Sequence, residues 1–516
     1  MKIKSLLIPM TIFAGLTANA ATYYVSPEGM GSKNGTNTEN AFGVTEFTAQ
    51  AAANENGDVY YFAGGTYIIP TTVIFQVATG AYLYGNENGE RTIFSGDSNG
   101  NNNPESGDAG RLIRFQANTV DGNSANAIVV KNIDFTCVFT NTDDSSNNSG
   151  ALAVDNSGDV LVENCNFYNN WAEGTQGGPA AYLYRSTVKF VGCVFSNNKA
   201  NYRGGAIRIN SNANTKGLIT FENCVIKNNI NYHNLGGAIF AANFNSINIV
   251  NSTIYGNSAA AGSGAAIYFN GLNSDYPRLL RVVNSTIAGN TVGDSVVTDG
   301  QIASTQSANI YVVNSIIPSS DTCQSIYLTG EEPSDDFQFV SGGYNYIDGI
   351  ASATDLEIEW QDTDYSGEDC TYVNIFGDNT LNNNVLLPQE FYLGATGEEV
   401  VSAVNDWNLP AGLELTTDQF GNARTGEVTM GAVALTAEDI ENEDNGDEEN
   451  GDNGEDDNGD NGDDTNGVNC ITNNIEKVIV YNLQGIAVKS NVIFEIDKST
   501  LPSGLYIING KKVLIK

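Results

Sequence analysis

A repeat of roughly 30 residues runs through the middle of this 516-residue chain and limits the folds that it can adopt. A four-residue segment that ends in an apolar residue recurs, with its last position spaced by 32, 28, 31, 28, 33 and 30 residues. These apolar positions are Phe135, Phe167, Phe195, Ile226, Ile254, Ile287 and Ile317. Five of the copies carry Asn three residues later, at Asn170, Asn198, Asn229, Asn257 and Asn290. Such a period indicates a solenoid, in which each repeat packs on its neighbours.

Each repeat contains short β-type runs with alternating polarity, as at 206–209, 217–221 and 246–250, and no amphipathic stretch of helix length. Gly-rich segments precede several of these runs. We therefore predict an all-β chain whose body is a right-handed parallel β-helix, with the seven apolar positions stacked inside it. The Asn column is expected in turns, where Asn tolerates left-handed backbone and can hydrogen-bond to the Asn of the next coil.

Three cysteines at one repeat position, Cys165, Cys193 and Cys224, are predicted to be neighbours in consecutive coils. A metal or redox site is one interpretation, and a buried stack of small side chains is the other. Parallel strands in register suit disulfide geometry poorly, and the paired short spacing of zinc sites is absent. Later repeats carry serine at the same position. We favour packing.

The chain divides into four parts by composition. Residues 1–20 read as a secretory signal peptide, with Lys2 and Lys4 before a short apolar stretch and small residues at a cleavage site. Residues 21–437 form the β-helix domain, and 318–417 are expected to be its last irregular coils and a cap. Residues 438–467 contain 15 acidic and no basic residues, which predicts an extended, disordered linker. Residues 468–516 are expected to form a small antiparallel β-sandwich module, with runs at 477–481, 492–496 and 505–508.

The charge excludes two classes of partner. Acidic residues number 61 against 23 basic ones, and the formal net charge is −38. Nucleic acid and anionic membrane surfaces would repel such a chain. No segment after the first 20 residues reaches membrane-spanning length, so we expect no transmembrane segment in the mature chain.

The C-terminal part resembles a known export signal. Its pattern, from Val480 to Gly485, then from Leu501 to Ile507, then from Gly510 to Val513, resembles the C-terminal sorting domain of Bacteroidetes type IX secretion. The resemblance implies a secretion machinery as partner and a location at the outer-membrane cell surface or in the extracellular medium.

The body resembles bacterial surface β-helix proteins of the pectin-lyase-like class over residues 22–434. This resemblance rests on the opening segment from Tyr23 to Tyr67 and on the closing segment from Asp418 to Ala432. The repeat of Gly-Gly-Ala-Ile with Phe-x-x-Asn resembles that of chlamydial polymorphic outer membrane proteins, although the transport barrel of those adhesins is absent. The resemblance implies a fold, and this fold hosts many functions.

The residues best suited to ligand chemistry cluster in three consecutive coils. Arg185, Arg203, Arg208 and the single histidine, His233, lie there among several tyrosines, with Lys199 and Lys227 nearby. They are the candidate catalytic or binding residues, because a polysaccharide lyase needs a base and a cation that neutralises an acidic sugar. The alternative is that they are surface residues in an acidic protein, and this interpretation has more weight.

Other chemistry has less support. The segment 141–144 resembles paired catalytic aspartates of glycoside hydrolases, but it lies in a polar stretch that reads as a turn. No nucleotide, zinc or nucleophile motif is present, so no cofactor is expected. Calcium could bind acidic segments, but no spacing defines its ligands, and metal-binding residues are unassigned.

The leading hypothesis for function is a secreted, cell-surface, non-enzymatic adhesin or glycan-contacting protein, whose ligand is a carbohydrate or a host-surface molecule. The alternative is an enzyme acting on an acidic polysaccharide, a polysaccharide lyase before a glycoside hydrolase. A purely structural surface protein is the third hypothesis, and it predicts neither binding nor turnover.

Overall fold

The computed structural model describes residues 20–444 with gaps, together with four strands within 478–515. The gaps are 55–56, 118–126, 142–149, 212–216, 243–244, 271–277, 294–298, 306–307, 320–321, 330–337, 353–357, 367–375, 377–380 and 383–384. The chain forms two compact units, which are described in turn. The first contains Met1–Asn86, Glu90–Thr220 and Asn229–Ser246, and the second contains Glu87–Gly89, Phe221–Asn228 and Ile247–Lys516.

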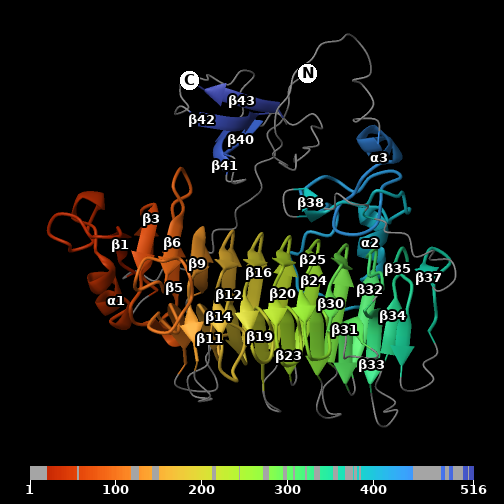
Figure 1. Ribbon diagram of the computed structural model, residues 1–516, viewed down its shortest axis with the longest axis horizontal. Helices are drawn as coiled ribbons and strands as arrows, with labels where there is room; N and C mark the ends of the chain where they lie inside the picture. Colours follow the sequence, from red (N-terminus) through yellow and green to blue (C-terminus); the bar gives the residue numbers. More distant parts are fainter. Residues whose placement is uncertain are drawn as a thin grey trace, which may run out of the picture. The chain divides into compact units, whose positions relative to one another are not determined.

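In the first unit the coils pass through up to four strand positions, with strands of the third position from residue 139 onward, and strands of successive coils pair in parallel to give four sheets (Figure 1). Sheet 1 contains β1 (Thr22–Val25), β2 (Val59–Phe62), β5 (Ala81–Tyr84), β8 (Ile128–Lys131), β12 (Val160–Glu163) and β16 (Thr187–Val191). Sheet 2 contains β3 (Gly65–Ile68), β6 (Thr92–Ser95), β9 (Ile133–Thr136), β13 (Asn166–Tyr168) and β17 (Val194–Ser196). Sheet 3 contains β10 (Phe139–Thr140), β14 (Trp171–Ala172), β18 (Lys199–Ala200) and β22 (Ile230–Asn231). Sheet 4 contains β4 (Val73–Gln76), β7 (Ile113–Gln116), β11 (Leu152–Asp155), β15 (Ala181–Tyr184), β19 (Ile207–Asn210) and β23 (Ile239–Ala242).

The second unit repeats the same four positions. Sheet 1 there contains β28 (Arg278–Val283), β32 (Ala308–Val313) and β34 (Gln338–Ser341), and sheet 2 contains β21 (Val225–Lys227), β25 (Thr253–Tyr255) and β29 (Thr286–Ala288). Sheet 3 contains β26 (Ser258–Ala259) and β30 (Thr291–Val292), and sheet 4 contains β27 (Ile267–Asn270), β31 (Gly300–Thr305), β33 (Gln324–Thr329) and β36 (Ile350–Ser352). Two sheet 1 strands, β20 (Gly217–Glu222) and β24 (Asn245–Val250), have residues in both units. The fold is therefore the right-handed parallel β-helix that the repeat predicts.

The smaller elements cap and extend these coils. They are η1 (Thr38–Asn40), α1 (Val44–Ala52), η2 (Val77–Thr79), β35 (Tyr346–Ile347), β37 (Tyr365–Ser366), β38 (Leu381–Asn382), β39 (Val385–Leu386), α2 (Gly397–Ala403) and α3 (Ala437–Asp444). In the first unit, Phe47 of α1 is fully buried, with ring centroids 5.4 Å from Tyr60 and 5.0 Å from Phe62 of β2. This helix is the N-terminal cap expected from the opening segment.

The predicted internal stack of apolar residues is confirmed, because all seven side chains are fully buried. In the first unit, the rings of Phe135, Phe167 and Phe195 lie nearly parallel, with successive centroids 4.8 Å apart. In the second unit, Ile226 and Ile254 pair in register. The recurring apolar position is thus the inward-facing residue of sheet 2.

The asparagine ladder also forms, but the left-handed backbone falls elsewhere than expected. In the first unit, Nδ2 of Asn170 donates to Oδ1 of Asn198, and Nδ2 of Asn198 donates to Oδ1 of Asn229, both at 2.9 Å. The left-handed residues are the preceding ones, such as Asn169 and Asn197 with φ of 54° and 55°. The turn needs one positive φ, and the buried amide that follows it is used for hydrogen bonding.

A second left-handed column lies at the bend between sheets 1 and 2. The first residue of every repeated segment has φ between 46° and 60°, and these residues are Asn132, Asn164, Gly192, Asn223, Asn251, Asn284 and Asn314. Glycine and asparagine are the residues that adopt this conformation most readily. The repeated Asn, with Gly once in its place, is therefore explained by backbone geometry.

The C-terminal parts differ in detail from expectation. Thr436 and Asp439 form reciprocal capping contacts, with Thr436 N donating to Oδ2 at 2.9 Å, so α3 is helical where the extended linker was predicted to begin. The rest of the linker lies outside the described residues. In the C-terminal part, β40 (Val478–Asn482), β41 (Ala487–Asn491), β42 (Gly504–Ile508) and β43 (Lys511–Ile515) form one antiparallel sheet in the order β41-β40-β42-β43. The expected strand at 492–496 lies outside the described residues.

Candidate functional site

The sequence candidates lie in the first unit, on or next to sheet 4. Arg208 is in β19, Arg185 follows β15, and Arg203 lies in the turn that precedes β19. Lys199 lies in β18 of sheet 3 instead. In the second unit, Lys227 lies in β21 of sheet 2, so neither lysine belongs to the arginine cluster.

Strand register determines which side chains are neighbours on the outer surface of sheet 4. Because side chains alternate along a strand, every second residue of β11, β15, β19 and β23 points outward. In register, Tyr182 lies between Ala153 and Arg208, and Arg208 lies next to Phe240. We call the resulting surface the arginine–tyrosine face, and it consists of Arg111, Arg114, Asp155, Tyr182, Tyr184, Arg185, Arg203, Arg208 and Phe240.

Arg208 is the most enclosed of the predicted residues, with 5% of its surface exposed. Its Nη1 donates to the carbonyl oxygen and to Oε1 of Gln176, at 2.6 and 2.7 Å. Its guanidinium carbon lies 5.3 Å from the ring centroid of Tyr182, while its Nε has no hydrogen-bond partner. Burial lowers the pKa of Arg208, because the charged form loses hydration.

A second buried guanidinium lies on the same face. Arg111 is 9% exposed, and its Nε also lacks a hydrogen-bond partner. Burial, and then the positive charge of Arg114, lower the pKa of Arg111 to about 10. The nearby carboxylate is engaged by Arg114, whose Nε lies 2.6 Å from Oδ2 of Asp155. Buried arginine donors without acceptors are costly, so both guanidinium groups are held on this face at a cost in free energy.

Two further arginines stack on aromatic rings. The guanidinium carbon of Arg185 lies 4.6 Å from the centroid of Tyr184. That of Arg203 lies 5.4 Å from Tyr202 and 5.8 Å from Phe240. Both arginines have positive φ, 51° and 47°, which is uncommon for residues other than Gly, Asn and Asp. The backbone is therefore strained at both arginines, in the turns that hold their side chains against the rings.

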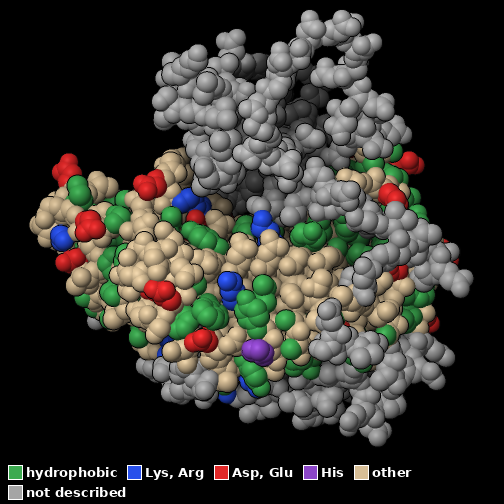
Figure 2. Space-filling view, viewed as in Figure 1, with side chains coloured by type: hydrophobic (Ala, Val, Ile, Leu, Met, Phe, Trp, Pro, Cys, Tyr) green, Lys and Arg blue, Asp and Glu red, His purple; other side chains and the backbone are tan. Residues whose placement is uncertain are grey.

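His233 is separate from this cluster. It lies on the turn before β23, is exposed, and is visible as the single purple side chain in Figure 2. Its ring centroid lies 6.5 Å from that of Tyr232. Among the described residues, no hydrogen bond or ring contact joins it to the arginines. The structure therefore brings together three of the four predicted site residues.

The sequence did not point to Arg111, Arg114, Asp155, Gln176 or Phe240. Arg111 and Arg114 precede the three coils in which cations were sought, and only the strand alignment of sheet 4 brings them near Tyr182. A signal existed, because five of the nine arginines of this acidic chain belong to the sheet 4 face once its strands are aligned.

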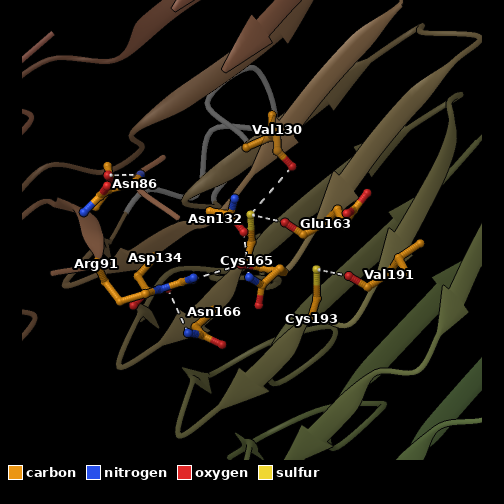
Figure 3. Close-up of polar contacts among 12 residues, drawn as sticks. Asn86, Arg91, Val130, Asn132, Asp134, Glu163, Cys165, Asn166, Val191 and Cys193 are labelled. Carbon is orange, nitrogen blue, oxygen red and sulfur yellow. Dashed lines mark hydrogen bonds and ion pairs between the residues drawn. The ribbon is translucent and has the colours of Figure 1, made fainter. Parts of the chain in front are cut away.

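The cysteine column is a packing feature (Figure 3). In the first unit, Cys165 Sγ lies 3.4 Å from the carbonyl oxygen of Glu163, and Cys193 Sγ lies 3.5 Å from that of Val191. In the second unit, Ser252 Oγ donates to the carbonyl oxygen of Val250 in the same way, at 2.7 Å. Each thiol is buried and bonded to backbone, as packing predicts.

The same view shows a polar network on the outer surface of sheet 2. Nη2 of Arg91 lies 2.6 Å from Oδ1 of Asp134, and Asn166 donates to the same oxygen at 2.8 Å (Figure 3). Arg91 also donates to the carbonyl oxygen of Asn164 at 2.9 Å. These groups satisfy one another and join successive coils, so they serve stability.

In the part of the chain that the structure describes, no group of three or more His, Cys, Asp or Glu side chains is placed to hold a metal ion. No described helix is both long and apolar enough to cross a membrane. The segment 142–149, which includes the predicted aspartate turn, lies outside the described residues.

Comparisons with known proteins agree with this architecture. The family model "Right handed beta helix region" matches residues 59–243. The fold is that of a right-handed β-helix. Among solved structures, the chain is similar to a rhamnogalacturonan lyase (13% identity, TM-score 0.41, covering 71% of this chain and 95% of that one). It is also similar to a pectate lyase, Pel9A (16%, 0.41, 82% and 98%), and to PfbA, a surface adhesin of Streptococcus pneumoniae (14%, 0.26, 67% and 89%). No curated protein sequence matches.

Proposed function

We propose that this protein is an exported β-helix protein that binds glycans at the cell surface through its arginine–tyrosine face, without turning them over. The observation that carries the proposal is the gathering of arginine and tyrosine side chains on the outer surface of sheet 4, with Arg185 stacked on Tyr184 and Arg208 on Tyr182. Sugar hydroxyl and carboxylate oxygens would accept hydrogen bonds from the arginines, and the tyrosine rings beside them offer surfaces on which sugar rings stack.

Export is part of the same proposal. The sequence of residues 1–20 supports it through its signal-peptide pattern, and the C-terminal part through its resemblance to a sorting domain. The antiparallel pairing of β40 to β43 is compatible with a small independent module. Attachment at the outer membrane or release into the medium would then place the face in contact with glycans.

The charge distribution adds selectivity to this proposal. The chain carries a net charge of −38, so most of its surface repels acidic polymers. The arginine–tyrosine face concentrates positive charge on a few coils, so an acidic glycan would be attracted there first. Binding of an acidic glycan should accordingly weaken as salt rises.

The test is affinity electrophoresis of the full chain in gels that contain polygalacturonate or alginate. We expect retarded migration, and we expect Arg208→Gln to weaken binding by roughly tenfold or more, because a charged bidentate contact is lost. Arg91→Gln is the matched control, since Arg91 lies on sheet 2, and its binding should equal that of the unmodified chain. Equal retardation of both variants would contradict the assignment of the face.

A polysaccharide lyase is the second candidate, and one observation favours it. Burial lowers the pKa of both Arg208 and Arg111, the latter to about 10, and a lowered pKa leaves more of the neutral guanidine, the form that can accept a proton. Incubation with the same acidic glycans, with calcium and then with chelator, would release new reducing ends in that case. Turnover that Arg208→Gln abolishes, with unchanged thermal unfolding, would replace the binding proposal by the enzymatic one.

A further inference from the structure

A row of three tyrosines lies on the outer surface of sheet 1 in the first unit. Tyr24, Tyr61 and Tyr84 occupy the same register position in β1, β2 and β5. Their ring centroids are 5.8 and 5.4 Å apart, and neighbouring rings are tilted by only 26° and 28°. The inward-facing residues beside them, such as Tyr60 and Leu83, are fully buried. The row is therefore a surface feature, separate from the core.

The exposure of this row is unusual for an aromatic cluster. Tyr61 has 45% of its surface exposed, and its two neighbours are partly exposed. A second outward column runs beside the row, with Tyr82, Val129 and Leu161 in register; Val129 is buried, and the other two side chains are partly exposed. Large exposed apolar surfaces on a soluble protein commonly mark binding sites.

The polar groups of the row define what it can bind. Because the rings stack on one another, their faces are mutually covered, and their edges and hydroxyl groups point outward. The structure gives none of the three hydroxyls a hydrogen-bond partner among the described residues. The next position in the row is Lys131, whose charge is neutralised by Glu163 at 2.7 Å. The surface thus presents repeated hydroxyl groups and apolar edges without free charge.

We propose that this tyrosine row binds an uncharged polysaccharide that lies across the strands. The tyrosine rings repeat along it with centroids 5.8 and 5.4 Å apart, which suits a polymer of similarly sized, hydroxyl-bearing rings. The acidic character of the chain disfavours an anionic polymer here, because no unpaired arginine or lysine of the described residues lies in the row. This surface uses other strands and other chemistry than the arginine–tyrosine face, so it does not rest on the proposed function.

The experiment is affinity electrophoresis of the full chain in gels that contain glucomannan or hydroxyethyl cellulose. We expect both polymers to retard the protein. Tyr61→Phe keeps the ring stack and removes one hydroxyl, and it should weaken binding by about fivefold. Tyr61→Ala also removes the central ring, and it should weaken binding by roughly tenfold or more. Thermal unfolding of each variant shows whether the fold is retained, and Tyr61→Phe keeps the test valid if Tyr61→Ala does not fold.

The outcomes are distinguishable. Arg208→Gln should leave retardation by glucomannan unchanged, while Tyr61→Phe should leave retardation by polygalacturonate unchanged. Failure of the unmodified chain to bind either neutral polymer would overturn the inference, as would binding by both Tyr61 variants that is unchanged from that of the unmodified chain. Sedimentation that reveals a dimer which Tyr61→Phe or Tyr61→Ala dissociates would identify a second copy of the chain as the occupant, and would also overturn it.

Discussion

At the scale of single residues, the buried asparagines carry the most specific interactions of the coils. Asn198 is fully buried, and its side chain takes part in four hydrogen bonds. Its Oδ1 accepts from the backbone N and from Nδ2 of Asn170, while its Nδ2 donates to Asn229 Oδ1 and to the carbonyl oxygen of Phe167. Every one of these bonds joins one coil to the next, so the ladder sets their stacking.

Replacement of Asn198 by alanine should therefore be costly. Asn198→Ala leaves buried donors and acceptors on the neighbouring coils unpaired, and we expect a loss of about 3 kcal/mol in the free energy of unfolding. Urea unfolding followed by circular dichroism measures it. Asn201→Ala is the control, because its Nδ2 makes a single exposed bond to Glu173 O, and its loss should stay below about 1 kcal/mol. Equal losses in the two variants would refute the role of the ladder.

The residue scale also shows what the sequence could predict. The periodic Phe and Ile positions identified the inner stack, because burial imposes the same residue type in every coil. Asn170 and its equivalents were correctly assigned to a hydrogen-bonded column, although the left-handed residue is Asn169. Arg111 was not among the predicted residues. It lies near Tyr182 only because coils that are separated in sequence stack on one another.

At the scale of elements, the segment around α2 covers one side of the second unit. Val250, Val283 and Val313, which end β24, β28 and β32, pack against Val400 and Trp407 and are fully buried. In the first unit the same sheet 1 position holds Lys131 and Glu163. The position is fully buried in the strands that the segment covers, but only partly buried at Lys131, Glu163 and the next residue in register, Val191.

This cover should be tested by removing its largest side chain. Trp407 is 6% exposed, and its ring centroid lies 5.3 Å from that of Tyr311. Trp407→Ala should destabilise the covered region by about 3–5 kcal/mol, since a large buried side chain is lost. Hydrogen exchange should then accelerate in β24, β28 and β32. Val401→Ala, on the exposed side of α2, should leave exchange unchanged, because Val401 is 46% exposed.

The sequence predicted a cap in this region but not its path. Glu414 N donates to Oε1 of Glu222, and Gln419 Nε2 donates to the carbonyl oxygen of Cys224, contacts that span more than a third of the chain. Local patterns carry little information about such distant contacts, because they depend on the completed coils. The repeat determined the strands, whereas the route of the covering segment followed from tertiary packing.

At the scale of the whole molecule, stability comes from contacts between neighbouring coils, so an entire coil should be removable. Deletion of residues 164–191 would bring the coil of β9, β10, β11 and β12 next to the coil that starts at Gly192, with Phe135 facing Phe195. We expect a folded β-rich protein whose unfolding is still cooperative, because each interface is repeated. Circular dichroism with thermal melting measures the outcome.

Deletion of half a coil provides the control for this prediction. Removal of residues 164–177 would delete β13 and β14, so this coil would lose its strands in sheets 2 and 3. We expect this variant to lack a cooperative transition, because buried apolar side chains would no longer meet one another. Cooperative melting of both variants, or of neither, would contradict the model of independent coils.

The cysteine column has a consequence for the behaviour of the protein under oxidation. Burial raises the pKa of the Cys165 thiol well above its usual value, and oxidants attack the thiolate. While the coils are intact, burial shields the described thiols from oxidants, even in an oxidising medium. Unfolding exposes several of them together, and thiol–disulfide exchange can then link sulfurs that never meet in the folded chain. The folded protein should therefore resist oxidation, whereas protein that has unfolded in air should fail to refold, because its thiols form non-native disulfides.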